Sequence, residues 1–298
     1  MRLKRISYII FLIGLSIFMY PHVHMLLFEA QNQSAFNEYE NVVQHMSDDE
    51  ISKYIEEFQN YNEYVANGVT EPEYDDPFIA EVTQRKIEGT KEVVRKVATS
   101  NGAFGYLEVP KIKQTLPIYL GASMSNLAKG VAQIEDTSLP IGGMGTNSVI
   151  AGHRGYSKGY PIFKYLDKLA IGDRFYIHAY NMTLTYEVIR IEVILPNQTE
   201  KLKIDPEKDM VTLLTCTPYQ VSTHRLLVYG LRVNGISEIK GSTDKGVLSL
   251  SSSRESAESI DVRNARYISY AIVGVGSVLW VTVLILFIRT FRKEPRRS

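Results

Sequence analysis

Residues 211–230 read Val-Thr-Leu-Leu-Thr-Cys-Thr-Pro-Tyr-Gln-Val-Ser-Thr-His-Arg-Leu-Leu-Val-Tyr-Gly, and they contain a clear pattern of two β-strands. Val211–Thr215 and Leu226–Val233 are rich in β-branched and aromatic residues, which is typical of β-strands. A polar stretch that contains a proline lies between them and indicates a loop. We therefore expect two adjacent antiparallel strands, with Cys216 at the end of the first and Arg225 at the start of the second.

Five earlier segments have the same composition and are separated by Gly, Pro, Asn and Asp. They are Tyr106–Val109, Leu116–Leu120, Ser148–Ala151, Arg174–His178 and Leu184–Leu195. Their regular spacing predicts a mainly β fold in which the strands form a closed or nearly closed barrel. Helices are expected to be few in this region, at Ser125–Lys129 and Pro161–Leu169.

The residues before the barrel have a helical pattern. Ser47-Asp48-Asp49-Glu50 matches a capping box, in which Ser47 and Glu50 satisfy each other's free amides. Apolar residues then recur at steps of three and four, and they predict one buried helix face; they are Ile51, Tyr54, Ile55, Phe58, Tyr61 and Val65. Prolines interrupt the pattern, so we expect a loop at about 68–79 and a second helix at about 80–97.

Both ends of the chain are apolar and basic. Ile268–Ile288 holds 21 uncharged residues, enough to cross a bilayer as a helix. Ile6–Tyr20 is a second apolar run behind three basic residues, and it predicts a signal anchor or a cleaved signal peptide. Because basic flanks stay inside, we expect both termini in the cytoplasm and residues from about 30 to 265 outside the cell membrane.

Charge and cysteine content exclude several classes of protein. Residues 29–288 carry 25 basic and 32 acidic side chains, so nucleic acid is not an expected partner. The chain has one cysteine, which excludes an intramolecular disulfide and a cysteine zinc cluster. We expect no cofactor, and no acidic cluster in the sequence suggests a metal site.

Three polar side chains lie at ends of predicted strands. Cys216 could be a nucleophile, His153 in Gly-His-Arg-Gly an acid and base, and Arg225 the donor that stabilises an oxyanion. Each also has a simpler reading: the cysteine as a small buried hydrophobe, the histidine as a structural residue, and the arginine as a surface charge. The three together are more specific than any one of them.

These motifs resemble the signature of the sortases. His153 in Gly-His-Arg-Gly, Cys216 in Thr-Leu-Leu-Thr-Cys-Thr-Pro-Tyr and Arg225 in Thr-His-Arg-Leu-Leu-Val match the family pattern over about residues 104–236. The resemblance implies an eight-stranded sortase β-barrel and a cysteine transpeptidase. Such an enzyme cleaves a Leu-Pro-x-Thr-Gly signal between Thr and Gly, holds the acyl chain as a thioester, and passes it to an amine.

The chain is most similar to class C sortases, which polymerise pilins. Such enzymes typically have a second membrane span, a long N-terminal helical segment, and a lid with an Asp-Pro-aromatic motif, which Asp76-Pro77-Phe78 matches. The resemblance implies that Asp76 approaches the catalytic Cys or Arg and that Phe78 fills the substrate groove. Pro77 would stiffen this lid and lower the entropy cost of holding it closed.

The resemblance implies a thiol enzyme of the Gram-positive cell surface, whose partners are the membrane and pilin subunits that bear a sorting signal and an acceptor lysine. Three alternatives remain open: a sortase that anchors proteins to peptidoglycan, a cysteine hydrolase that uses water, and a membrane-anchored scaffold that binds pilins without catalysis. The expected divisions are a membrane anchor at 1–28, a helical segment with the lid at 29–103, the catalytic barrel at 104–236, a polar tether at 237–266, a transmembrane helix at 267–289 and a basic tail at 290–298.

Overall fold

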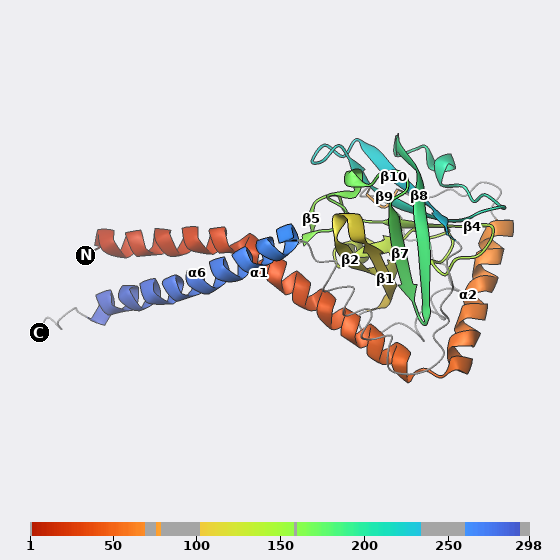
Figure 1. The fold of residues 1–298 in the computed structure, drawn as a ribbon. Coiled ribbons are helices and arrows are strands. Elements are labelled where there is room, and N and C mark those ends of the chain that lie inside the picture. Colours follow the sequence, from red (N-terminus) through yellow and green to blue (C-terminus); the bar gives the residue numbers. More distant parts are fainter. Residues whose placement is uncertain (1, 69–75, 79–101, 158–159, 234–259, 293–298) are drawn as a thin grey trace, which may run out of the picture. The chain divides into compact units, whose positions relative to one another are not determined.

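The computed structural model describes residues 2–68, 76–78, 102–157, 160–233 and 260–292, and forms two compact units (Figure 1). One unit contains the two ends of the chain, residues 1–30 and 258–298, together with 158–160. The other contains residues 31–157 and 161–257, which include the barrel. The expected helix at about 80–97 and most of the expected tether lie outside the described residues.

The second unit is built on a closed eight-stranded barrel with the strand order β1-β2-β3-β4-β9-β10-β8-β7. The predicted fold class is therefore confirmed. The strands are β1 (Ala103–Val109), β2 (Gln114–Leu120), β3 (Val131–Gln133), β4 (Thr146–Ala151), β7 (Arg174–Ala179), β8 (Met182–Ile194), β9 (Asp209–Thr217) and β10 (His224–Arg232). A separate two-stranded sheet consists of β5 (Tyr156–Ser157) and β6 (Tyr160–Pro161).

The strands β4, β9 and β10 lie side by side in the barrel wall. The strand β9 pairs in parallel with β4 and antiparallel with β10. All residues of β4 are buried, as are the residues of β9 from Met210 to Cys216. Two buried polar side chains of these strands are paired, since Thr212 Oγ1 donates to Asn147 Oδ1 at 2.8 Å. A strand buried on both faces is held firmly in register, so the residues at its end have a fixed position.

Two local predictions differ from the structure. The strand β3 was not predicted, because three residues are too few to show a period of two. The expected helix at Pro161–Leu169 is wrong: this stretch contains the end of β6 and the 3₁₀ turn η2 (Leu166–Lys168). The backbone N–H of Phe163 donates to the carbonyl of His153 at 2.9 Å, so it is used to hold a neighbouring turn rather than a helix.

Helix α2 (Asp48–Gly68) packs along the barrel (Figure 1). Its predicted capping box is present: the Ser47 N–H donates to Glu50 Oε2 at 2.9 Å, and the Glu50 N–H donates to Ser47 Oγ at 3.3 Å. The buried side chain of Asn62 donates to the Leu139 carbonyl at 3.2 Å and accepts from the Leu139 N–H at 2.7 Å. These two hydrogen bonds fix α2 to the loop before β4.

The first unit contains two helices that are long and apolar enough to cross a membrane. They belong to α1 (Arg2–His45) and α6 (Ile260–Arg292). Side-chain bonds join them in opposite order along the two sequences: Arg5 to the Thr290 carbonyl, Trp280 to Ser16, and His22 to Ser269. The helices are therefore antiparallel, and their N- and C-terminal ends lie together.

The helix boundaries differ from the expected divisions of the chain. Helix α1 continues through the expected boundary at residue 28 without a break. Helix α6 begins at Ile260, within the expected tether, so the described part of that tether is helical. Gly276 lies against Met19, whose sulfur would be only 2.6 Å from an added Cβ. A small residue at this point allows the two backbones to approach closely.

We predict that Asn62→Ala lowers the free energy of unfolding by about 2–3 kcal/mol, because two buried backbone groups lose their partner. Denaturant unfolding of the full chain in detergent measures the change. Asn67→Ala is the matched control, since Asn67 is an exposed asparagine of the same helix, and it should change stability by less than about 0.5 kcal/mol. Equal losses in the two variants would contradict this account of how α2 is attached.

Candidate active site

Cys216 and Arg225 are direct cross-strand partners on β9 and β10. Paired residues on neighbouring strands point to the same face, with their Cβ atoms about 5 Å apart. Both side chains are buried: Cys216 is 8% exposed and Arg225 is 4% exposed. The antiparallel pair that the sequence predicted therefore brings a thiol and a guanidinium together inside the barrel wall.

His153 reaches the same end of the barrel from β4. The last residue of this strand, Ala151, pairs with Leu214 of β9, so the next residues of the two strands continue side by side. Burial lowers the pKa of His153, which favours the neutral imidazole. The structure thus brings the three sequence-predicted site residues to one end of three adjacent strands. The roles that the resemblance assigns to them remain predictions.

The described lid residues, Asp76–Phe78, lie over this end of the barrel. Asp76 accepts two hydrogen bonds from Arg225, from Nε at 2.7 Å and from Nη2 at 3.1 Å, and its side chain is 7% exposed. The ring of Phe78 lies 5.5 Å from the ring of His153 and 5.4 Å from the guanidinium carbon of Arg225. Pro77 is buried. The three residues therefore cover the histidine and the arginine together.

All nitrogens of the Arg225 guanidinium have partners in this state. Nη1 donates to the carbonyls of Ser222 and His224, at 3.0 and 2.9 Å, and Asp76 takes Nε and Nη2. The loop carbonyls hold the group in one orientation. The carboxylate of Asp76 accepts from the two other nitrogens, Nε and Nη2, which is the two-pronged geometry in which an arginine binds a planar anion.

The covered site favours a neutral thiol. Burial raises the pKa of Cys216; the charge of Arg225 opposes this effect, and the carboxylate of Asp76 adds to it. With the pKa of His153 lowered at the same time, the pair is not disposed to form a thiolate and an imidazolium. The arrangement could supply a nucleophile, a proton carrier and an oxyanion donor, and Asp76 occupies two of the Arg225 donors in this structure.

The turn that carries His153 is bonded to the strand that carries Cys216. Thr215 Oγ1 donates to the Gly152 carbonyl at 2.7 Å, and Arg154 Nη1 donates to Thr217 Oγ1. Neither Arg154 nor either threonine was predicted from the sequence to be a site residue. The available signal was that both threonines flank Cys216, so their side chains share the strand face opposite to the cysteine.

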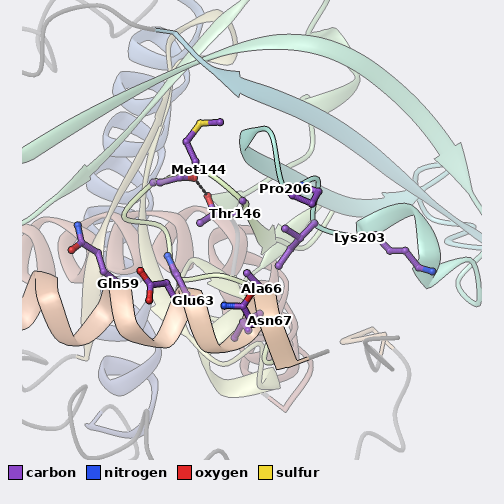
Figure 2. A pocket seen from close by; sticks show the side chains of 14 residues that line it. Gln59, Glu63, Ala66, Asn67, Met144, Thr146, Lys203 and Pro206 are labelled. Carbon is purple, nitrogen blue, oxygen red and sulfur yellow. Dashed lines mark hydrogen bonds between the residues drawn. The ribbon is translucent and has the colours of Figure 1, made fainter. Parts of the chain in front are cut away.

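A cavity of about 580 Å³ lies at the other end of the barrel. Figure 2 shows Gln59, Glu63 and Asn67 of α2 facing Met144 and Thr146 of the glycine-rich turn, with Lys203 and Pro206 beside them. This turn precedes β4, whereas His153 follows β4, so the cavity is remote from the thiol. By contrast, the cavity beneath Asp76 and Pro77 measures only about 20 Å³. Among the described residues, no group of three or more His, Cys, Asp or Glu could hold a metal ion.

Comparisons with known proteins agree with the geometry. The sortase domain family model matches residues 107–233. The solved structure of Streptococcus agalactiae sortase C1 is 35% identical, with a TM-score of 0.61, and the match covers 69% of this chain and 97% of that one. A solved Streptococcus pneumoniae sortase C is 34% identical, with the same TM-score, over 70% of this chain and 99% of that one.

A curated relative, sortase D of Bacillus subtilis, is 30% identical over 134 residues. That match covers 44% of this chain and 64% of the relative, so the chain spans less than two thirds of its length. The family model covers nearly the whole barrel, including the ends of β4, β9 and β10. The chain belongs to the sortase family.

Proposed function

We propose that this protein is a membrane-anchored cysteine transpeptidase that joins pilin subunits. The observation that carries the proposal is the pairing of Cys216 with Arg225 beside His153 in a buried barrel wall. A scaffold that only bound pilins would have no need to bury a guanidinium against a thiol, because burying a charge costs free energy.

In the first half of the reaction, the lid leaves and the Cys216 thiol gives its proton to His153. The resulting thiolate attacks the threonine carbonyl of a Leu-Pro-x-Thr-Gly-like signal. The guanidinium of Arg225 donates hydrogen bonds to the oxyanion, through the donors that Asp76 had occupied. His153 gives its proton to the amine of the departing glycine. The Thr–Gly bond breaks, and a thioester on Cys216 remains.

In the second half, an amine attacks the thioester. His153 accepts a proton from the amine, Arg225 again stabilises the oxyanion, and the thiolate of Cys216 departs. We propose the lysine side chain of a second pilin subunit as the amine, which gives an isopeptide bond. This choice is supported by the similarity to the pneumococcal sortase C, for which pilin substrate specificity is described.

We also propose that the lid is inhibitory. Asp76 holds the oxyanion donors of Arg225, and Phe78 covers His153. A sorting signal must displace both residues. Its apparent affinity is therefore the intrinsic affinity multiplied by the fraction of the protein in which the lid is open.

The membrane arrangement follows from the two apolar helices. The antiparallel pairing of α1 and α6 brings both chain ends together, and both ends are basic. We propose that both termini are cytoplasmic and that the barrel lies outside the membrane.

We predict that the full chain in detergent, with Asp76→Ala and Phe78→Ala to open the lid, forms an adduct with a Leu-Pro-x-Thr-Gly peptide. Intact mass should increase by the peptide without its glycine-containing tail, and Cys216→Ala should abolish the adduct, because no thioester can form. A pilin segment with a lysine should then release the acyl chain as an isopeptide. An adduct that persists in Cys216→Ala would contradict the mechanism.

The acceptor distinguishes the competing functions. Release by the pilin lysine supports pilus assembly, whereas release only by a peptidoglycan-like amine would assign the protein to surface anchoring. Release by water alone, at the same rate with and without amines, would assign it to hydrolysis. No adduct with any sorting peptide, together with pilin binding, would support the scaffold.

We predict that the lid variant lowers the pKa of Cys216, since it removes both the carboxylate and the cover that raise it. Below that pKa, the thiolate fraction grows as the pKa falls, so iodoacetamide should react faster at neutral pH. The pH profile of alkylation should shift to lower pH relative to the unmodified chain. Glu200→Ala, at an exposed position of the 3₁₀ turn η3 (Thr199–Leu202) outside the lid, is the control. An unchanged profile would contradict the inhibitory role of the lid.

A further inference from the structure

The residues on both sides of His153 are bonded to the residues on both sides of Cys216. The carbonyl of Gly152 accepts from Thr215 Oγ1 at 2.7 Å, and the guanidinium of Arg154 donates to Thr217 Oγ1. The backbone adds a third bond, from the Gly152 N–H to the Leu214 carbonyl at 3.0 Å. Of these three bonds, the one from Arg154 connects the residue after His153 to the residue after Cys216.

The side chain of Arg154 is largely buried and ion-paired. Its side chain is 8% exposed, and Nη2 lies 2.9 Å from Asp167 Oδ2. Its Nε is buried and has no hydrogen-bond partner within the described ranges of the chain. A buried donor without a partner costs stability, so the placement of this guanidinium is poorly explained by stability alone.

The turn after β4 depends on such a contact. Regular pairing of β4 ends at Ala151, before His153, and Gly152 follows it. The imidazole must nevertheless keep its distance from the thiol within a fraction of an ångström, since a displacement of about 1 Å can cost about 100-fold in rate. The hydrogen bond from Arg154 to Thr217 joins the part of this turn after His153 to the strand that carries the thiol.

We propose that Arg154 is a positioning residue: anchored by Asp167, it holds the His153 turn against the Cys216 strand through Thr217. This inference rests on the proposed function, because the positions of His153 and Cys216 matter only if they react together. The positive charge of Arg154 also favours the thiolate, since it lowers the pKa of Cys216 against the larger effect of burial.

The test compares Arg154→Met, Thr217→Val, their double variant and Thr217→Ser in the lid-open full chain. Arg154→Met and Thr217→Val should each lower kcat for peptide transfer by about 10- to 100-fold, with KM changed by less than about twofold. The double variant should be no slower than Arg154→Met, because both changes remove the same bond. Thr217→Ser keeps the hydroxyl and should recover most of the rate.

The control is Arg174→Met, which breaks a cross-strand ion pair with Glu187 on the exposed side of β7 and β8. It should leave kcat unchanged. Unfolding midpoints are measured for every variant, so that a loss of stability can be separated from a loss of rate. An unchanged kcat in Arg154→Met, or multiplied losses in the double variant, would overturn the proposal.

Alkylation by iodoacetamide keeps this test separate from that of the proposed function. In the lid-open chain, Arg154→Met should slow the alkylation of Cys216 at pH 7 by about twofold, because the thiolate loses the stabilising effect of this positive charge. If the lid-open chain forms no peptide adduct but alkylation slows as expected, the proposed function fails and the charge contribution of Arg154 stands. If the adduct forms and both alkylation and kcat are unaffected, the proposed function stands and this inference fails.

Discussion

The register of β9 between β4 and β10 is the constraint on which the site depends. The pairing places Cys216 opposite Arg225 and carries β4 to its end at Ala151, just before His153. A slip of one residue would turn the thiol to the other face of the wall. The apolar residues that bury both faces of β9 therefore fix the geometry of the chemistry as well as the stability of the barrel.

Much of this arrangement could be predicted from the sequence, because the strands that carry the site are strongly patterned. Seven strands could be recognised from their β-branched and aromatic residues, and the capping box at Ser47 and Glu50 is present as expected. The positions of Cys216 and Arg225 at neighbouring strand ends followed from the short loop between them. Local composition is sufficient where an element is long and its neighbour in space is also its neighbour in sequence.

The remaining features depend on contacts between distant parts of the chain. The strand β3 has only three residues, and it is a strand because β2 and β4 pair with it. The stretch after Pro161 gives a backbone donor to the His153 turn instead of forming a helix. The attachments made by Asn62 and Arg154 join residues 77 and 63 positions apart, respectively. No pattern within a short window can reveal such bonds.

The docking of α2 has a consequence for how far the lid can travel. Asn62 fixes this helix to the loop before β4, and the helix ends at Gly68, eight positions before Asp76. Even fully extended, a segment of that length spans only about 28 Å. Under the proposed inhibitory role, a released Asp76 would remain at an effective concentration of about millimolar, as for a short linker. The proposed lid would then be a tethered competitor that a sorting peptide must displace at every turnover.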